Sequence, residues 1–329
     1  MTAYDVMPDI ELFQPVTVED AATLAARLGA DGWLLAGGQD TYGWLKDRAR
    51  HPRAMIDLAA VTELQGVREL GNGLSIGAMT SLTELIRNPL VKARFDLLVQ
   101  AAGRVASPQI RNQGTLGGNL AQDTRCWYYR RGLSCYRAGG NICYADGPKS
   151  MNREHAVFGA SRCVAVTPSD TAVALMALDA VMVIQNSRGV RRVNVTDFFV
   201  GPAVNIRHMT VLRPGDVLTA IEIPDTFAGA DFYFEKVADR NVWDFALVSV
   251  AAAYRMKGGL IDDARLVLGA VECVPRRLRD IERAAIGKAR SEETAGSLAG
   301  FASRGARPLN HNHFKLPLME NLVARALRS

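Results

Sequence analysis

NQGTLGGNL, which occupies Asn112–Leu120, is the stretch of sequence that points most directly to a fold. It places three glycines within the five positions from Gly114 to Gly118, and Thr115 and Asn119 add side chains that form hydrogen bonds. Because glycine lacks a Cβ, successive backbone N–H groups in such a loop can converge on an anion or follow a ribityl chain. The stretch therefore predicts a loop that holds a phosphorylated cofactor.

A second glycine turn, LLAGGQD, lies near the start of the chain at Leu34–Asp40. An apolar, strand-like run leads into Gly37 and Gly38, an arrangement that can present backbone N–H groups to an anion. No G-x-G-x-x-G follows, so this is not the fingerprint of a Rossmann fold. Taken alone, the motif is more simply explained as a tight turn. Two separate glycine loops, however, suit a long dinucleotide such as FAD better than a mononucleotide.

Four of the five cysteines follow the central glycine loop, at positions 126, 135, 143 and 163. Their spacing is not that of the C-x-x-C pairs in common zinc ribbons. Four thiolates bind zinc tetrahedrally, and four thiolates are equally the ligands of a 4Fe-4S cluster. The spacing therefore leaves a cluster, zinc and free thiols open. The fifth cysteine, Cys273, lies in an apolar strand-like run and is expected to be a buried core thiol.

The chain has 329 residues, 48% hydrophobic and 22% charged, which predicts a globular protein of two or three domains. Met1–Asp9 contains two aspartates and no apolar core, so no signal peptide is expected, and structural disulfides are not expected either. The apolar run Ala172–Ile184 is too short to span a bilayer and is interrupted by Asp179. The net charge of +5 comes from scattered basic residues without a nucleic-acid-binding motif, so no nucleic acid partner is expected.

Apolar periodicity and turn residues divide the chain into three regions. The pattern predicts a small α/β unit over residues 1–60 and a larger α/β region over residues 61–226. It predicts a sheet covered by helices over residues 227–329. Helices are expected at Ala21–Leu28, Leu82–Ile86, Phe95–Ala101 and Thr171–Leu178. Strands are expected at Trp33–Ala36, Ala54–Leu58, Leu74–Ile76, Val181–Gln185, Val217–Ile223, Phe232–Val237, Ala246–Tyr254 and Ala264–Ala270. Ile142–Ala160 is polar with little periodicity and predicts an irregular loop.

Six segments, spread over nearly the whole chain, together resemble the FAD-binding medium subunit of the xanthine dehydrogenase family of molybdenum hydroxylases. They are AGGQD (Ala36–Asp40), ASPQIRNQGTLGGNL (Ala106–Leu120), PSDTAVALMALDA (Pro168–Ala180), LRPGDVLTAIEIP (Leu212–Pro224), FEKVADR (Phe234–Arg240) and LVLGAVECVPRR (Leu266–Arg277). The resemblance implies an α+β fold with a FAD-binding domain of the vanillyl-alcohol-oxidase type over residues 1–226, in two subdomains that meet near residue 60. An α/β C-terminal domain of the CO dehydrogenase flavoprotein type would follow over residues 227–329.

The resemblance also implies which residues hold FAD. The first loop would bind the pyrophosphate through backbone amides, and the second would meet the adenine-side phosphate and the ribose or ribityl hydroxyls. Asp170 would lie near the other face of the cofactor and Lys236 near the flavin ring. The implied cofactor-binding residues are Ala36, Gly37, Gly38, Gln39, Asp40, Ser107, Asn112, Gly114, Thr115, Gly117, Gly118, Asn119, Asp170 and Lys236. Two local alternatives stay open: Asp170 as a helix N-cap, and Lys236 as a solvated strand residue.

Arg125–Cys143, together with Ser161–Val166, resembles a subgroup of the family that carries an extra loop with a 4Fe-4S cluster, here at about residues 121–163. The subgroup includes the flavin subunits of 4-hydroxybenzoyl-CoA reductase and of bacterial aldehyde oxidoreductase, and the latter is the nearer match. The implied ligands are Cys126, Cys135, Cys143 and Cys163. His155 within the loop and His311 and His313 near the end of the chain are expected to be surface residues.

The implied function is electron transfer within a heteromeric molybdenum hydroxylase that is an oxidoreductase for an aldehyde, an N-heterocycle or an aromatic CoA thioester. A large subunit would hold the molybdenum cofactor, a small subunit would hold 2Fe-2S clusters, and the acceptor would be NAD, oxygen, a quinone or a ferredoxin. No catalytic residue is expected on this chain, because such chemistry belongs to the cofactors. A cytoplasmic location is expected, with co-export to the periplasm as a variant. The alternatives are a stand-alone flavin oxidase and a zinc-stapled FAD-binding scaffold.

Overall fold

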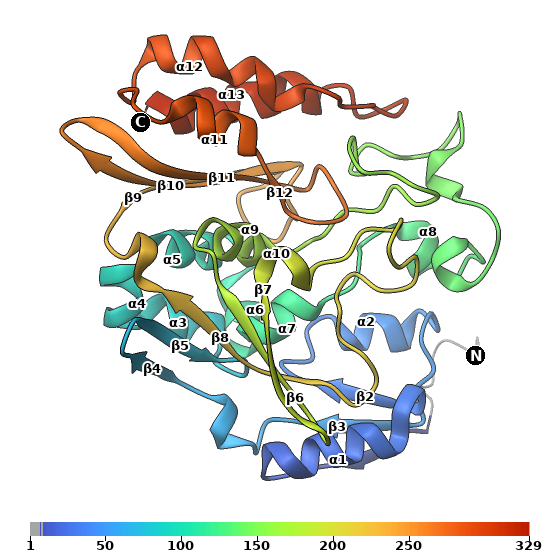
Figure 1. Ribbon diagram of the computed structural model, residues 1–329. Coiled ribbons are helices and arrows are strands. Elements are labelled where there is room, and N and C mark those ends of the chain that lie inside the picture. Colours follow the sequence, from blue (N-terminus) through green and yellow to red (C-terminus); the bar gives the residue numbers. More distant parts are fainter. Residues whose placement is uncertain (1–6, 8, 329) are drawn as a thin grey trace.

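The computed structural model of the chain describes Met7 and residues 9–328. The expectation that Met1–Asp9 is no signal peptide therefore falls largely outside the described residues. Three sheets follow one another through the molecule, with helices between and around them (Figure 1). This combination of sheets and helices confirms the predicted α+β fold class.

The N-terminal unit is a three-stranded parallel sheet covered by a helix. Strand β3 (Ala54–Asp57) lies between β1 (Glu11–Phe13) and β2 (Gly32–Leu35). Helix α1 (Val18–Leu28) begins where the Thr17 side chain accepts a hydrogen bond from the backbone N–H of Asp20 at 3.1 Å. Its buried residues recur at a helical spacing, which gives α1 one apolar face toward the sheet. They are Val18, Ala21, Ala22 and Ala25.

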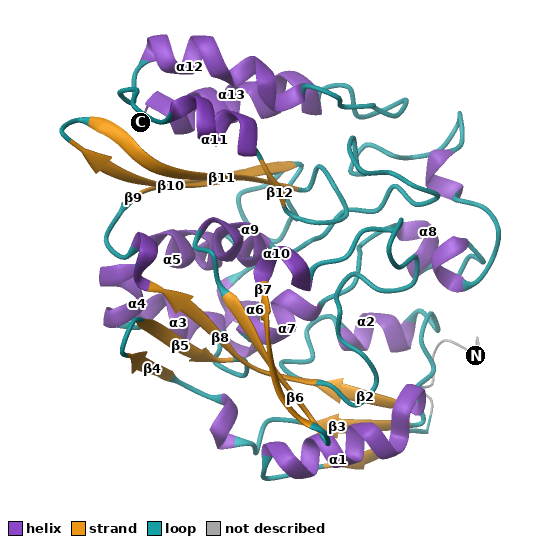
Figure 2. Ribbon diagram, viewed as in Figure 1, coloured by secondary structure: helices purple, strands orange, loops and turns teal. Residues whose placement is uncertain are grey.

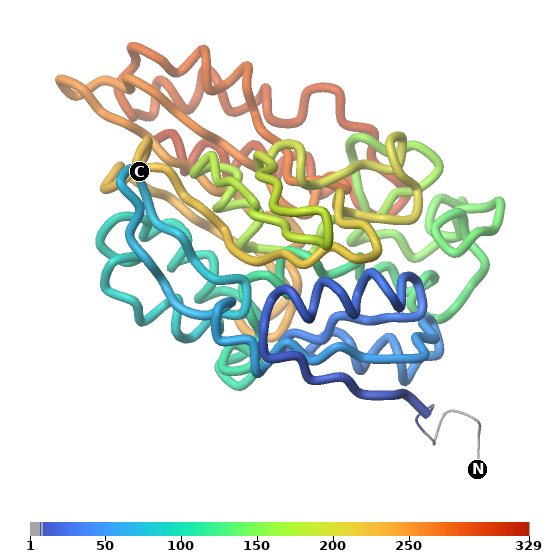
Figure 3. The backbone as a smooth tube through the Cα atoms, turned by 60° about the horizontal axis from the view of Figure 1, so that its bottom comes forward, coloured from blue at the N-terminus to red at the C-terminus, as the bar shows by residue number. Residues whose placement is uncertain are grey.

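The second sheet has five antiparallel strands in the order β4-β5-β8-β6-β7, and it shares a core with the N-terminal unit. The strands are Val67–Leu70, Gly73–Gly77, Val217–Pro224, Val181–Asn186 and Gly189–Asn194, in that order. Helix α1 packs against β6 and β8 (Figure 3). The helices of this region are α2 (Thr41–Lys46), α3 (Leu82–Arg87), α4 (Pro89–Arg94), α5 (Asp96–Gly103), α6 (Pro108–Gln113), α7 (Leu116–Ala121), α9 (Asp170–Ala177) and α10 (Val195–Phe198).

The third sheet has four strands in the order β12-β11-β10-β9, and helices cover both of its faces (Figure 2). Ala251 and Ala253 of β10 belong to the core around α9, whereas Val250 and Ala252 belong to the core beneath the C-terminal helices. This alternation follows from the two-residue period of a strand. The strands are Arg276–Arg277, Leu260–Gly269, Val248–Lys257 and Asp231–Val237, in that order, and the helices are α11 (Arg279–Ala285), α12 (Glu292–Leu298) and α13 (Lys315–Arg328).

Residues 122–163, hereafter the cysteine loop, run outside the three sheets (green in Figure 1). Regular structure within this segment is confined to α8 (Trp127–Arg130) and the 3-10 turns Tyr136–Ala138 and Tyr144–Asp146. The prediction of an irregular loop at Ile142–Ala160 is confirmed. Elsewhere, none of the described helices is both long and apolar enough to cross a membrane.

Candidate functional site

The two glycine motifs, far apart in the sequence, meet at one wall of a cavity of about 550 Å³. A Cβ on Gly37 would lie 2.8 Å from the carbonyl carbon of Gln113, and a Cβ on Gly118 would lie 3.4 Å from the Cβ of Ala36. The contact between the motifs therefore depends on the missing side chain at Gly37, which no larger residue could replace without a shift of backbone. In this protein the glycines bring two loops together as well as leaving room for a ligand.

The cavity collects nearly all of the predicted cofactor residues. Its walls include every one of them except Ser107 and Asn112. The Ser107 side chain instead caps α6 by accepting a hydrogen bond from the backbone N–H of Ile110, and the Asn112 side chain accepts one from the hydroxyl of Thr83 at 2.7 Å. These two residues therefore shape the helix that supports the second motif, and they do not line the cavity.

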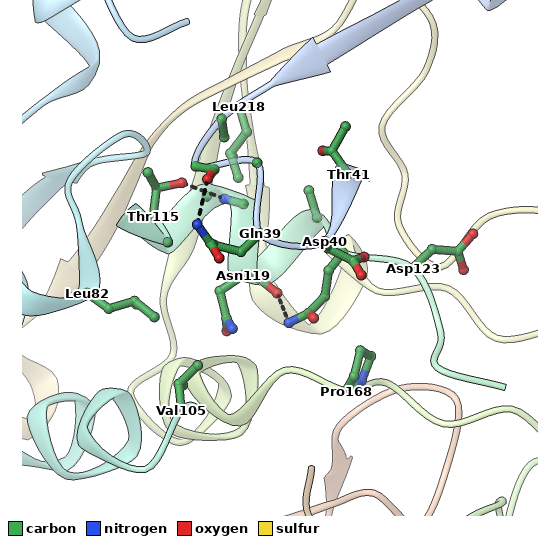
Figure 4. Close-up of a pocket in the computed structure, with 18 of the residues that line it drawn as sticks. Gln39, Asp40, Thr41, Leu82, Val105, Thr115, Asn119, Asp123, Pro168 and Leu218 are labelled. Carbon is green, nitrogen blue, oxygen red and sulfur yellow. Dashed lines mark hydrogen bonds between the residues drawn. The ribbon is translucent and has the colours of Figure 1, made fainter. Parts of the chain in front are cut away.

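The first motif brings free hydrogen-bond donors to the cavity. Strand β2 delivers the chain to Gly37, and α2 begins just beyond Asp40. In the described structure, no protein acceptor receives a hydrogen bond from the backbone N–H groups of residues 37–40. The side chain of Gln39 bends back toward the Gly37 carbonyl oxygen at 3.4 Å (Figure 4). The loop can thus present several N–H groups to an anion.

The second motif is a helix start and not an open loop. Thr115 is the N-cap of α7, and its hydroxyl accepts a hydrogen bond from the backbone N–H of Gly118 at 3.1 Å (Figure 4). The backbone N–H of Gly117 donates to the Ala78 carbonyl at 2.7 Å, and that of Asn119 donates to the Thr115 carbonyl at 2.9 Å. These amides are engaged within the protein. What this motif presents to the cavity is a smooth glycine surface and the Asn119 side chain.

Asn119 is held by two hydroxyls from the start of α9. Its Oδ1 accepts hydrogen bonds from Ser169 Oγ and Thr171 Oγ1, both at 2.6 Å. This pattern leaves its Nδ2 group as a donor at the cavity wall. Ser169 also caps α9 by accepting from the backbone N–H of Ala172 at 3.1 Å. The alternative of Asp170 as the N-cap is therefore wrong, because Ser169 takes that role and Asp170 is the first helical residue.

Asp170 and Lys236 form a buried ion pair in the cavity wall. Lys236 Nζ lies 2.6 Å from Asp170 Oδ2 and also donates to the carbonyl oxygen of Arg104 at 3.0 Å. Only 4% of Asp170 and 6% of Lys236 is exposed, so the alternative of Lys236 as a solvated strand residue is wrong. Burial raises the pKa of Asp170, and the charge of Lys236 opposes that rise.

Two further carboxylates in the cavity wall are paired with arginines, three of which belong to the cysteine loop. Asp40 accepts hydrogen bonds from Arg130 at 2.6 Å and from Arg125. Asp123 pairs with Arg137 at 2.7 Å and with Arg50 at 3.1 Å. Sequence reasoning missed these arginines. Their pairing depends on the folded path of an irregular segment, which no local pattern reports.

The four cysteines of the loop lie near one another but do not line this cavity. Cys126 and Cys135 share a small apolar cluster with Trp44 and Tyr129. Burial, with smaller contributions from the Cys163 and Cys143 thiols, raises the pKa of the Cys126 thiol to about 12. Burial also raises the pKa of Cys163, with smaller contributions in the same direction from Cys143 and Cys135. Each of the four thiols is thus within electrostatic range of at least one of the others. Across the described residues, however, no three His, Cys, Asp or Glu side chains stand in an arrangement that could hold a metal ion.

His155 is not a surface residue, contrary to the sequence-based expectation. It is 4% exposed, and its Nε2 lies 3.2 Å from Cys126 Sγ. Burial lowers its pKa to about 4. The carbonyl oxygen of His155 accepts hydrogen bonds from Asn312, three residues before α13, at 3.0 Å and from Lys315, the first residue of α13, at 2.9 Å. The other expectations hold: His311 and His313 are exposed, and Cys273 is buried.

A second cavity, of about 300 Å³, adjoins the first. Pro168, Asp170 and Trp243 line both cavities, and Cys126 and His155 belong to the wall of the second. The cysteine loop and the cofactor cavity therefore border a common space.

The comparisons with known proteins agree with this geometry. The chain matches the family described as the FAD binding domain in molybdopterin dehydrogenase over residues 8–226, and the CO dehydrogenase flavoprotein C-terminal domain over residues 233–329. It is 32% identical over 320 residues to the FAD-binding subunit of an aldehyde oxidoreductase from Escherichia coli (strain K12), covering 96% of each chain. It is 30% identical over 274 residues to the medium chain of glyceraldehyde dehydrogenase from Sulfolobus acidocaldarius, covering 83% of this chain and 80% of that one.

Among solved structures, carbon monoxide dehydrogenase from Hydrogenophaga pseudoflava has a chain that matches this one with a TM-score of 0.76 and 29% identity. The match covers 97% of this chain and 96% of that one. The relatives and the matched domains agree over almost the full length described. The chain belongs to the family of FAD-binding subunits of molybdopterin dehydrogenases.

Proposed function

We propose that this chain is the FAD-carrying electron-transfer subunit of a heteromeric molybdenum hydroxylase. The observation that carries the proposal is the meeting of the two glycine motifs in one cavity, with the backbone N–H groups of residues 37–40 free to donate. When bound there, FAD would supply transfer of electrons in steps of one or two, which none of the side chains can provide.

Each part of the cavity wall has a role in this proposal. The N–H groups of residues 37–40 bind the pyrophosphate, and the flat surface of Gly117 and Gly118 lets the cofactor approach the start of α7. Asn119 donates from Nδ2 to a hydroxyl or phosphate oxygen. Asp170 and Lys236 both line the first cavity, Asp170 also borders the second, and we place the flavin ring beside this pair.

The partners we propose are a large subunit with a molybdenum cofactor and a small subunit with 2Fe-2S clusters. Support comes from relatives that are named medium chains or FAD-binding subunits, names that belong to chains of larger assemblies. The substrate of the assembly would be an aldehyde, an N-heterocycle or an aromatic CoA thioester, and NAD, oxygen, a quinone or a ferredoxin would accept the electrons. We place the assembly in the cytoplasm.

We further propose that Cys126, Cys135, Cys143 and Cys163 bind a 4Fe-4S cluster. The donor set has the chemistry of such a site, since four thiols within electrostatic range are carried by an irregular loop. Two buried groups beside them also lack hydrogen-bond partners: Nδ1 of His155, and Nε and Nη1 of Arg137. The thiols would have to move together to form the ligand set, a change that a loop without regular structure allows.

Flavin binding and partner dependence test the main proposal. The purified apoprotein should bind FAD, with quenching of the flavin fluorescence. Co-expression with a large and a small subunit should yield a complex that reduces an acceptor in the presence of aldehyde, while the isolated chain should not. Turnover by the isolated chain would favour the stand-alone oxidase instead. Absence of FAD binding would refute the proposal.

Metal analysis tests the cluster. Protein purified without oxygen should contain iron and sulfide and give an EPR signal on reduction. Replacement of any one of the four loop cysteines by alanine should abolish the signal. Cys273→Ala, which removes the buried thiol outside the proposed ligand set, should retain iron, although this thiol lies within electrostatic range of Cys163. Zinc in place of iron would support the scaffold alternative, and iron retained in the loop variants would disprove the ligand set.

A further inference from the structure

The pairing of Asp40 with the cysteine loop raises an electrostatic question about the cofactor cavity. Asp40 is the last residue of the first glycine loop, whose N–H groups at residues 37–40 are free to donate, and it lines the same cavity. A carboxylate in that position would repel the pyrophosphate of a bound cofactor, since like charges at short range in a partly buried site interact strongly. The carboxylate is compatible with an anionic ligand only if another group neutralises it.

Arg130 is placed to neutralise the carboxylate of Asp40. Its side chain is 9% exposed, its Nη2 lies 2.6 Å from Asp40 Oδ1, and its Nε donates to the carbonyl of Thr124 at 3.1 Å. Its guanidinium carbon lies 3.8 Å from the centre of the Trp44 ring, within range of a cation–π interaction. Trp44 in turn donates from Nε1 to the other carboxylate oxygen of Asp40 at 3.1 Å. Contacts with Asp40, Thr124 and Trp44 therefore hold the Arg130 guanidinium in place.

Arg125 adds a second positive charge from the opposite end of the same turn. It forms an ion pair with the oxygen of Asp40 that Arg130 also contacts, and 41% of its side chain is exposed. Cys126 lies next to Arg125 in the chain and four positions before Arg130, in the turn that leads into α8. The two arginines that face Asp40 are thus carried by the same turn as the first loop cysteine.

We propose that Arg130, assisted by Arg125, is a positioning residue of the cofactor site that acts through Asp40. It cancels the charge of this carboxylate and holds the first glycine loop in the shape that directs its N–H groups into the cavity. The proposal rests on the proposed binding of FAD, and it holds whether or not the cysteines carry a metal. It gives the cysteine loop a direct influence on cofactor affinity.

A double-mutant cycle tests the proposal on the purified full-length chain, with FAD as the probe and quenching of its fluorescence as the readout. Arg130→Gln leaves Asp40 without its main counter-charge, so the Kd for FAD should rise about tenfold, equivalent to about 1.4 kcal/mol. Asp40→Asn in the same chain removes the charge that needed to be cancelled. The double variant should therefore bind FAD at least fivefold more tightly than Arg130→Gln alone. Added salt should narrow the deficit of the single variant, because salt screens repulsion.

Two more variants separate this role from a merely structural one. Arg265→Gln removes a comparably buried arginine that pairs with Asp179 and Asp263 outside the cavity, and it should leave the Kd unchanged. If Arg130→Gln does not fold, the exposed Arg125→Gln replaces it and should weaken binding severalfold, with the same rescue by Asp40→Asn. A double variant as weak as the single variant, or a single variant that binds like wild type, would overturn the proposal. A wild-type chain that binds no FAD would refute the proposed function itself.

Discussion

Gly37→Ala is the substitution for which the structure makes the sharpest prediction. The new Cβ would lie 2.8 Å from the carbonyl carbon of Gln113 and 2.9 Å from the Cα of Gly114. Carbon atoms in contact prefer about 3.5–4.0 Å, so the methyl group is short of room by roughly 0.7 Å or more. The crowded atoms belong to the backbone and cannot rotate away. The two glycine motifs must move apart, and we expect a loss of about 1–3 kcal/mol in the free energy of unfolding.

The same movement displaces the N–H groups of residues 37–40, so the affinity for FAD should fall about tenfold or more, which corresponds to at least about 1.4 kcal/mol. Urea unfolding of the apoprotein measures the first loss, and titration with FAD measures the second.

Gly103→Ala is the matched control. Gly103 lies at the end of α5, and a Cβ there would meet no atom within 4 Å. This variant should bind FAD like wild type and should be at least as stable, because alanine favours the helix over glycine. If Gly37→Ala bound FAD within twofold of wild type at unchanged stability, the contact between the two motifs would not be what forms the site.

Two further predictions concern buried amines. Lys236→Met leaves the carboxylate of Asp170 buried without its cation, so the free energy of unfolding measured with urea should fall by about 3–5 kcal/mol. Asp170→Asn in the same chain should recover part of this loss. A Lys236→Met protein as stable as wild type would show that the two residues are not a buried charge pair. The side chain of Lys315 is fully buried and donates hydrogen bonds to three carbonyl oxygens. Burial lowers the pKa of this side chain from 10.5 to about 7. At a pH between these two pKa values, the unfolded chain binds more protons than the folded chain. The free energy of unfolding should therefore rise with pH, by at most about 1.4 kcal/mol per pH unit. Urea unfolding at several pH values should show that rise in wild type and a smaller one in Lys315→Met, and equal slopes would contradict the assignment.

The parts of the fold that follow from local pattern were predictable. Strands β2, β3, β5, β6 and β8 have apolar residues bounded by turns, and the structure places strands at each predicted position. Strands β1, β4, β7 and β12 were not predicted, because they are short or carry charged residues. In β7 the arginines at 191 and 192 are stabilised by ion pairs with Asp216 and Glu222, partners about 25–30 residues away. A single-sequence pattern cannot report such partners.

The site followed the same rule. The glycine motifs point to a cofactor, because their composition is itself the signal. Their engagement with each other, the capping of α7 by Thr115, and the burial of His155 depend on contacts between distant segments. The same is true of Arg130, which in the sequence is one of several scattered basic residues. Charge pairs on irregular loops are difficult to predict from a sequence, because the partners lie far apart in the chain and no local pattern links them.

The hydrogen bonds from Asn312 and Lys315 to the carbonyl of His155 also set an order of events during synthesis. Asn312 is 157 positions and Lys315 is 160 positions from His155 in the sequence, so these hydrogen bonds form only after the start of α13 has left the ribosome. Contacts of such long range form late, because the loop between them must first close. Until then the segment around His155, whose Nε2 lies 3.2 Å from Cys126 Sγ, lacks these two hydrogen bonds. The burial of His155 beside Cys126 is therefore expected to be completed late in folding, after the residues at the start of α13 have docked.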